Sequence, residues 1–452
     1  MRNCFIILCG LILSAGYLYA LGPHEVLLLV NEKSSDSCEI ASEYARIRDI
    51  PETNIVRLNL PGSNAVPPLM ISPDDFAKFI WAPAKKAVKD RGIDDHVLVW
   101  VYSTDFPTTI RFNPEMSILG LTFLRNTFQD TEKVKMGSYA SPLFGGPDGP
   151  AGLPLLSQTF DVSKEWLREE MPLPCMMLGY TGAQGNTKDQ VLKYLKNGVE
   201  SDGMSPSGTV FFVTSNDIRS QCRAWQFVKA AKELKALNVL AIVTNAFPIG
   251  QQKIIGLMSG ATHVTPEEGN NVYLPGCMAE HLTSLAGMFD SDNQTKLTAW
   301  LKAGATSSSG TVTEPLSLWT KFPSARFFVH YASGCTMIES YYQSIRCPLQ
   351  ILLVGDPLAC PWRPKAEVVI KGVERESVAG ILDLSAELQG DQKYGYRKYQ
   401  FFLDGKVVGD DRILKLDTAS ISEGLHVLRA VAYGTGYVRN QAFGEKKFSV
   451  KR

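Results

Sequence analysis

Two stretches of the sequence decide the fold prediction, Ile254-Ile-Gly-Leu-Met-Ser-Gly-Ala-Thr-His263 and Val272-Tyr-Leu-Pro-Gly-Cys-Met-Ala-Glu-His-Leu-Thr-Ser-Leu-Ala-Gly287. Each begins with a mainly apolar run and ends in small and polar residues, and a short polar loop separates the two. Such runs are typical of strands in a parallel sheet that is buried on both faces. In open parallel sheets, functional side chains gather beyond the carboxyl ends of the strands. We therefore expect these two stretches to end beside a site.

The same pattern recurs across residues 25–362, where amphipathic helical segments separate several short apolar runs. The runs lie at 26–30, 55–60, 96–102, 209–213, 239–243, 254–258 and 349–354. One helix is predicted to begin at Ser72-Pro73, and another to span Gln294–Lys302. Apolar strands that alternate with helices indicate a mostly parallel sheet covered on both faces. We predict an α/β three-layer domain over residues 21–362.

Two segments depart from this pattern. Residues from about 104 to 172 are rich in Pro, Gly, Thr and Phe, which predicts a loop-rich insertion beside the site. Residues 365–452 show short alternating runs separated by turns such as Asp404-Gly405 and Glu423-Gly424. Because helical periodicity is absent there, this segment is predicted to be a small all-β, immunoglobulin-like sandwich.

The first twenty residues have the layout of a secretory signal peptide. Arg2 precedes an apolar run, and the segment closes on small and aromatic residues that end at Ala20. The alternatives are a first buried strand and an uncleaved anchor. The next apolar run, 25–30, is too short to span a bilayer. We predict a signal peptide at 1–20 and a secreted, periplasmic or cell-surface protein without a transmembrane anchor in the mature chain.

Composition narrows the classes of partner. The chain has 452 residues, with 46 Lys and Arg against 46 Asp and Glu, so its formal net charge is zero. Its apolar fraction of 45% excludes a mostly disordered chain. Phosphate binding needs clustered positive charge, so the balance argues against nucleic acid and against electrostatic adhesion to anionic membranes.

The cysteines do not form the framework of a disulfide-rich domain. Of nine in the chain, Cys4 and Cys9 fall within the first twenty residues, and the rest are scattered without a CxxC pair. In an oxidising compartment Cys347 has two candidate partners, Cys335 and Cys360. The simpler interpretation is that most of these cysteines are small buried hydrophobes.

Familiar chemical motifs are absent from the sequence. It contains no GxxxxGK[ST], no GxGxxG after a strand, no HExxH and no GxSxG. No two of its six histidines are four residues apart, so no metal site is predicted. No cofactor is predicted either.

Several candidate site residues follow the predicted strands. His263 and Ser284 end the two stretches quoted above, Glu314 follows a Ser/Thr/Gly segment, and Asp356 follows the last apolar run. We expect these residues to meet at the carboxyl edge of the sheet. Ser307-Ser-Ser309 is interpreted as a tight turn rather than a group of nucleophiles.

The chain resembles an uncharacterised family of secreted bacterial proteins found in species with exosortase/PEP-CTERM protein sorting. The matching segments span most of residues 25–362 and are Ser42-Glu-Tyr-Ala-Arg-Ile-Arg-Asp-Ile-Pro51 with Asn54-Ile55, Glu280-His-Leu-Thr-Ser284, Gly304-Ala-Thr306 with Gly310-Thr-Val-Thr-Glu-Pro315, and Gly355-Asp-Pro-Leu358. The resemblance implies a secreted location and a cell-envelope context. It implies no particular reaction.

A more distant resemblance is to the caspase-like fold of gingipain-type cysteine peptidases. In that fold a strand ends in His, the next ends in Cys-x-x-Gly, a helix leads to a Gly-Ala strand, and a Gly-Asp-Pro closes the domain. His263, Ser284 and Gly355-Asp-Pro357 occupy the matching positions. The chain departs from the pattern with serine in the nucleophile position and His-Val in place of His-Gly. Serine needs a well-placed base, so the resemblance implies His263 as base and backbone N–H groups near Gly287 as oxyanion donors.

Structural explanations stand beside these roles. His281, Thr283 and Glu314 are candidates for substrate binding, although His281 could equally be a polar strand-end residue that bonds its neighbours. Asp356 is either a third catalytic residue or a brace for the loop after the last strand.

Two functions follow from this interpretation. The first is a peptidase-like Ser/His hydrolase of the cell envelope, active or decayed. The second is a non-catalytic binding or structural protein of the envelope. A peptide or an envelope polymer is the expected partner in both.

Overall fold

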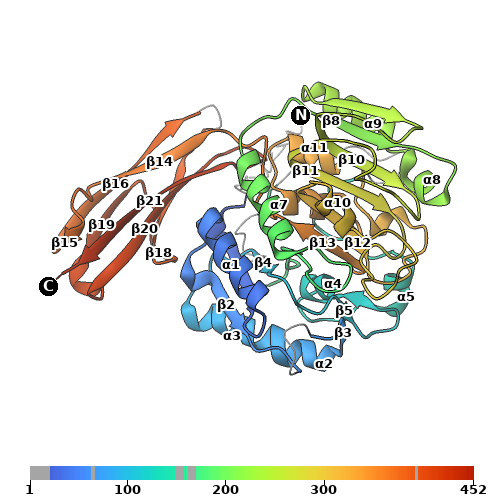
Figure 1. Ribbon diagram of the computed structural model, residues 1–452. Coiled ribbons are helices and arrows are strands. Elements are labelled where there is room, and N and C mark those ends of the chain that lie inside the picture. Colours follow the sequence, from blue (N-terminus) through green and yellow to red (C-terminus); the bar gives the residue numbers. More distant parts are fainter. Residues whose placement is uncertain are drawn as a thin grey trace, which may run out of the picture.

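The computed structural model describes residues 21–62, 67–147, 157, 159–160, 169–391 and 395–451. Within these residues, ten strands form one sheet in the order β2-β1-β4-β7-β13-β12-β11-β10-β8-β9 (Figure 1). They are β1 (Val26–Asn31), β2 (Ile55–Leu58), β4 (Val99–Tyr102), β7 (Cys175–Met177), β8 (Thr209–Val213), β9 (Leu240–Thr244), β10 (Ile254–Gly260), β11 (Tyr273–Leu282), β12 (Ser307–Thr311) and β13 (Ile351–Gly355). The expected signal peptide, 1–20, lies outside the described residues and stays a prediction.

The large sheet is mostly parallel, as predicted. Neighbouring strands from β2 to β7 and from β9 to β12 are parallel. β12 and β13 are antiparallel, with Ser307 opposite Gly355 and Thr311 opposite Ile351. The carboxyl end of β13 therefore lies beside the amino end of β12. β13 is parallel to β7, so β1, β2, β4, β7 and β13 run opposite to the strands from β8 to β12. The expectation that all strands end at one edge is therefore wrong for that half of the sheet.

Helices cover both faces of the sheet, so this part of the chain is an α/β layered domain (Figure 1). In β8, Phe211 packs in one cluster with Trp300, whereas the next residue, Phe212, stacks on Phe227 on the opposite face, with ring centroids 4.9 Å apart. The helices are α1 (Ser35–Arg48), α2 (Pro73–Phe76), α3 (Ala82–Arg91), α4 (Ile118–Phe123), α5 (Thr131–Lys135), α7 (Lys188–Ser201), α8 (Ile218–Ala224), α9 (Phe227–Ala236), α10 (Thr298–Lys302), α11 (Phe327–Ala332) and α12 (Met337–Ser344).

The starts of α2 and α10 and the conformation of residues 307–309 can be compared with the predictions. The helix predicted at Ser72-Pro73 is confirmed, because the hydroxyl of Ser72 accepts the N–H of Asp75 at 3.0 Å at the start of α2. α10 begins at Thr298 rather than at Gln294, because the side chain of Gln294 is bonded to the loop after β11. The tight turn expected at Ser307-Ser-Ser309 is wrong, since these residues begin the buried strand β12.

The predicted loop-rich insertion contains regular structure in its described part. It holds β5 (Thr109–Ile110), β6 (Met116–Ser117), α4 and α5, and β5 and β6 form a small sheet with β3 (Met70–Ile71). All residues of α4 are buried. The insertion is therefore partly an element of the core rather than a peripheral loop.

The chain after Ala366 forms two sheets that share one core. One sheet contains β14 (Ala366–Lys371), β16 (Ile381–Gly390) and β19 (Ile413–Asp417); the other contains β15 (Ser377–Val378), β21 (Gln441–Val450), β20 (Gly424–Tyr433), β17 (Lys398–Leu403) and β18 (Lys406–Gly409). Leu384 of the first sheet and Phe401 of the second belong to the same buried cluster. The sheets approach closely at Gly444, where a Cβ atom would lie 1.8 Å from the carbonyl oxygen of Val368.

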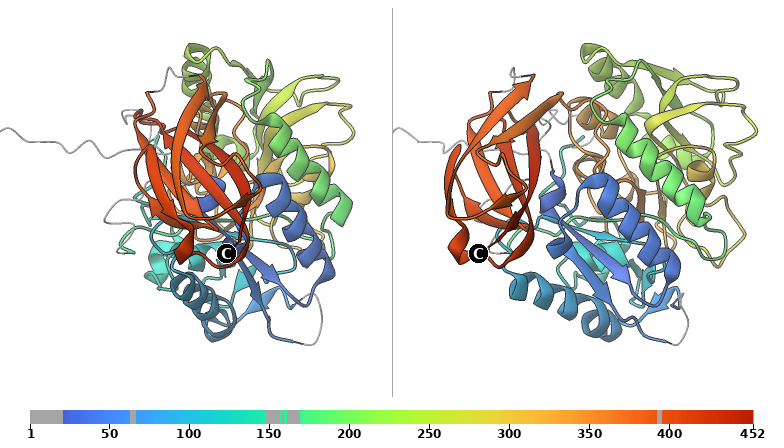
Figure 2. Two further views of the ribbon diagram at one scale, coloured as in Figure 1. Left: turned by 90° about the vertical axis from the view of Figure 1, so that its left-hand side faces the viewer. Right: turned by 60° about the vertical axis from the view of Figure 1, so that its left-hand side comes forward.

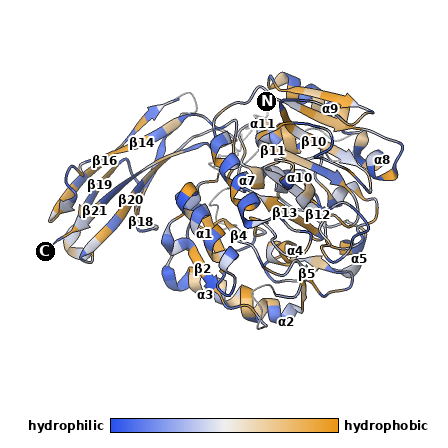
Figure 3. Ribbon diagram, in the orientation of Figure 1, coloured by the Kyte–Doolittle hydropathy of each residue, from blue (hydrophilic) through white to orange (hydrophobic). Residues whose placement is uncertain are grey.

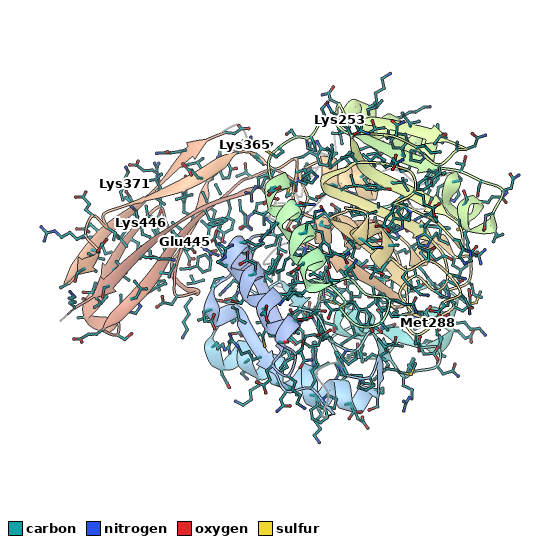
Figure 4. All side chains as sticks on the ribbon, viewed as in Figure 1. Lys253, Met288, Lys365, Lys371, Glu445 and Lys446 are labelled. Carbon is teal, nitrogen blue, oxygen red and sulfur yellow. The ribbon has the colours of Figure 1, made fainter. Side chains whose placement is uncertain are left out.

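This sandwich packs beside the α1 end of the larger domain (Figure 2). Thr53 donates to the carbonyl of Asp404 at 3.0 Å, and Gln441 donates to Glu25 at 2.7 Å. Glu445 lies on the sandwich near α1 (Figure 4). Polar and charged contacts thus join the two parts.

Candidate functional site

The tips that carry His263 and Ser284 belong to neighbouring strands. In the pairing of β10 with β11, Ser259 lies opposite His281 and Gly260 opposite Leu282. His263 follows three residues after Gly260, and Ser284 two after Leu282. Because adjacent strands are about 4.8 Å apart, both residues lie at the same end of the sheet in neighbouring loops. Lys253 precedes β10 and Met288 follows β11. The two labelled residues lie far apart in Figure 4 and mark the opposite edges of the sheet.

A short segment before α10 ties these loops together. Gln294 accepts hydrogen bonds from the hydroxyl of Thr283 at 2.6 Å and from the N–H of Leu285 at 2.9 Å. The hydroxyl of Thr295 accepts the N–H of Val264 at 3.1 Å. Thr283 is completely buried, so its hydroxyl holds the loop in place instead of facing a ligand.

The two residues of the expected dyad are not bonded to each other. His263 is exposed, and its Nδ1 lies 3.1 Å from the hydroxyl of Thr262. Ser284 is half-buried, and within the described residues no hydrogen bond joins its hydroxyl to His263. The N–H of Gly287 donates to the carbonyl of Thr311 at 3.0 Å, so this expected oxyanion donor is already used.

His281 is a buried strand residue. The indole N–H of Trp300 donates to its Nδ1 at 2.9 Å. Burial lowers the pKa of His281 to about 3, so the ring is neutral near pH 7. The structure thus favours the strand-end interpretation of His281 over substrate binding.

An ion pair lies under the same tips. The guanidinium of Arg223 on α8 is 2.5 Å from the carboxylate of Glu280, and both side chains are buried. Arg223 also donates to the carbonyl oxygens of Ser259 at 2.5 Å and Pro323 at 3.0 Å. One side chain therefore links the ends of β10 and β11.

Asp356 does not lie with the other candidates. It follows β13, whose carboxyl end is beside the amino end of β12, and its carboxylate is fully buried. Tyr44 donates to it at 2.8 Å, and Arg48 forms an ion pair with it. Burial raises the pKa of Asp356 while the Arg48 guanidinium opposes this rise. The geometry is that of a brace between α1 and the last strand, and it places Asp356 away from His263 and Ser284.

Glu314 lies in the loop beyond β12 and is exposed. Its carboxylate accepts the N–H of Leu316 at 2.9 Å. Because β11 and β12 are parallel, Glu314 is at the same edge as His263 and Ser284. Of the predicted residues at this edge, His263, Ser284 and Glu314 are at least partly exposed, whereas His281 and Thr283 are buried.

A pocket of about 510 Å³ opens beside His263. It lies between the loops that follow β8, β9 and β10. β9 and β10 pair with opposite edges of β8, so the chain switches sides of that strand here. Ligands of open α/β sheets bind at such switch points. The residues lining it combine polar groups with apolar ones: Val213, Thr214, Ser215, Asn245, Phe247, Ile249, Ser259, Gly260, Ala261, His263, Val264, Thr265, Glu268 and Gly269.

Sequence reasoning named His263 but missed most of this pocket. Ser215, Asn245 and Phe247 each follow closely on a predicted apolar run. That position is the sequence feature by which they could have been predicted to line a site. Ser259 is 4% exposed, and its hydroxyl has no hydrogen-bond partner in the described structure. This hydroxyl is therefore an unsatisfied polar group buried behind the pocket wall.

The described ranges contain no group of three or more His, Cys, Asp or Glu side chains arranged to hold a metal ion. Among the helices that the structure describes, none has both the length and the apolar character needed to cross a membrane.

Comparisons with known proteins assign no family. No protein-family model and no curated protein matches the chain. Fibronectin(III)-like modules of CbhA from Clostridium thermocellum align with a TM-score of 0.17 and 22% identity, over 24% of this chain and 54% of theirs, so the alignment spans about half of that structure. The endo-beta-1,4-mannanase from Thermotoga petrophila aligns with a TM-score of 0.17 and 10% identity over 82% of each chain. Likenesses at this TM-score support no argument about function.

Proposed function

We propose that this protein is a secreted cell-envelope protein whose α/β domain binds a polypeptide segment at the carboxyl edge of the large sheet. The observation that carries the proposal is the pocket of about 510 Å³ beside His263. Its apolar residues, such as Phe247 and Val264, offer contact area for a side chain, and polar groups around them supply hydrogen bonds. Pockets that bind organic ligands commonly combine these features.

The order of elements supports a caspase-like α/β domain as part of this proposal. His263 follows β10, Ser284 follows the neighbouring strand β11, α10 leads into β12, and Gly355-Asp-Pro357 closes the domain. This is the order that the resemblance to gingipain-type peptidases implies. We also propose that the sandwich has an immunoglobulin-like fold and is a module appended beside the binding domain.

Binding is favoured over catalysis by the state of the expected machinery. His263 and Ser284 share no hydrogen bond, the N–H of Gly287 is engaged, and Asp356 braces another part of the domain. A serine nucleophile needs a base within reach and donors for the oxyanion.

Hydrolysis is the second candidate, because His263 and Ser284 lie at the tips of adjacent strands. A fluorophosphonate probe tests it. Labelling of the wild type and of Ser317→Ala, an exposed serine control, but not of Ser284→Ala would establish a serine hydrolase. Equal labelling of all three proteins, or of none, would exclude the dyad.

Peptide binding is tested with a panel of fluorescein-labelled seven-residue peptides that carry Val, Leu or Phe at alternate positions and Thr or Glu between them. We expect at least one to bind, and Asn245→Trp, which fills the pocket, to weaken that binding by about tenfold or more. The matched control is Gln252→Trp, which is exposed just before β10 at the opposite edge. Failure of the wild type to bind any member of the panel would overturn the proposal.

A further inference from the structure

β9 is the outermost strand of the large sheet. It pairs with β8 from Leu240 opposite Thr209 to Thr244 opposite Val213, without a register shift. Its other edge has no neighbouring strand in the described part of the chain. A regular strand in this position presents a row of backbone N–H and C=O groups to a further strand.

The side chains of β9 are exposed and apolar. Leu240 is 59% exposed, and Ile242 and Val243 are each 39% exposed. Figure 3 shows the apolar colouring of the strands beside α9. β9 carries no charge, no proline and no bulge, which are the devices that normally protect a sheet edge.

The opposite edge of the same sheet does carry such protection. β2 includes the exposed Arg57, and the guanidinium of Arg91 donates to the carbonyl of Ile55 at 2.7 Å. One end strand is therefore blocked by charged groups while the other is left open. This difference indicates that the open edge has a use.

The apolar surface of β9 is continuous with the pocket. Ile242 lies opposite Phe211, and Phe211 belongs to the buried cluster against which Phe247 packs. Phe247 and the 72% exposed Ile249 also line the pocket, and Asn245 enters it directly after the last residue of β9. A strand laid along β9 would reach the pocket at that end.

We infer that an extended polypeptide with apolar side chains at alternate positions binds as an added strand along β9, with one end in the pocket at Asn245. This inference rests on the proposed function and names the ligand as a β-strand rather than a folded surface. Backbone hydrogen bonds to β9 supply affinity, and the apolar side chains that lie beside Leu240 and Ile242 supply preference.

Charge favours this occupant over a second copy of the chain. A two-fold pairing of β9 with β9 would bring two α9 helices together on one face of the joined sheet. α9 packs against β9 and carries the exposed Lys232 and Lys235, so the pairing would bring like charges onto the same face of the joined sheet. The same lysines favour a peptide with acidic residues between its apolar ones.

N-methylated peptides give a direct test. The strongest binder of the panel is resynthesised with N-methyl groups on its odd or on its even residues. In an added strand only one of these sets faces β9, so one version is expected to lose about tenfold or more in affinity and the other to bind like the parent. The charged edge variant Ile242→Lys is expected to weaken the parent peptide similarly, whereas Ile413→Lys, which alters a 66% exposed residue of the sandwich, is not.

The outcomes separate this inference from the proposed function. Binding that depends on Asn245 but tolerates both N-methylated peptides and Ile242→Lys would overturn the added strand and leave the pocket proposal standing. Absence of any binding would overturn both. A wild-type dimer in light scattering that Ile242→Lys converts to monomer would assign β9 to a second copy and overturn the inference.

Discussion

Arg223 and Glu280 form a buried ion pair, with 2.5 Å between guanidinium nitrogen and carboxylate oxygen, directly under the strand tips that border the pocket. Arg223→Met or Glu280→Leu alone leaves a charge buried without its partner, and each should lower the free energy of unfolding by about 3–5 kcal/mol. The double variant should be more stable than the sum of the single losses predicts. Urea unfolding of all four proteins measures this, and strictly additive losses would show that the pair is not coupled.

The brace at Asp356 predicts a loss of stability without a loss of binding. Arg48 pairs with both Asp356 and Asp202, so Asp356→Asn removes one of its two carboxylate partners and should lower the free energy of unfolding by about 1–3 kcal/mol. Tyr44→Phe, which deletes one hydrogen bond to the same carboxylate, should cost about 2 kcal/mol. Both folded variants should bind the best peptide of the panel with wild-type affinity, measured by fluorescence anisotropy. A folded Asp356→Asn protein that no longer binds the peptide would show that Asp356 contributes to the binding site.

Gly310 couples the sheet to the Ser284–Gly287 loop. A Cβ atom at this position would lie 2.6 Å from the carbonyl carbon of Ala286 and 2.7 Å from the nitrogen of Gly287. Gly310→Ala should therefore push the loop off β12 and destabilise the protein by about 1–3 kcal/mol. Gly250→Ala is a useful comparison, because a Cβ there meets no atom within 4 Å and only its positive φ of 66° opposes the change. A Gly310→Ala protein as stable as the wild type would mean that the close contact at Gly310 has no energetic weight.

His281 predicts a specific dependence of stability on pH. Burial lowers its pKa in the folded protein to about 3, whereas an unfolded histidine titrates near 6.5. Between these values the unfolded state binds a proton that the folded state does not, so stability falls as the pH decreases. The contribution is about 1.4 kcal/mol for each pH unit in that range. His281→Asn keeps an acceptor for the Trp300 indole, and its stability should fall less steeply than that of the wild type between pH 6 and pH 4.

The strands were the most predictable part of this chain. The apolar runs at 26–30, 209–213 and 254–258 became β1, β8 and β10, because a strand buried on both faces must be apolar along its whole length. A strand was expected after the predicted helix at 294–302, but residues 307–309 of it were assigned to a turn for the opposite reason, since they are serines. The serines of β12 are buried in the middle of the sheet, and Ser307 satisfies its hydroxyl by donating to the carbonyl of Val354 at 2.8 Å, a partner that is 47 residues away.

The site was only partly predictable. His263, Ser284 and Glu314 could be placed at one edge because each follows a recognisable strand or its continuation. The position of Asp356 depends on the direction of β13, which is set by pairing with β12 and by contacts with Tyr44 and Arg48 on a distant helix. No local pattern reports such long-range partners. The burial of Thr283 and His281 likewise comes from residues 294 and 300, which belong to another segment.

The central position of β13 has a consequence for how the chain matures. β13 is the last strand of the large sheet to be synthesised, yet it lies between β7 and β12 in the middle of that sheet. Until residues 351–355 have been synthesised, the strand that belongs between β7 and β12 is missing, and the facing edges of these two strands are unpaired. Late, non-local strand insertion of this kind is slow and leaves apolar edges open to misassembly. The two halves of the large sheet are therefore expected to join as a late step of folding, when β13 enters between them.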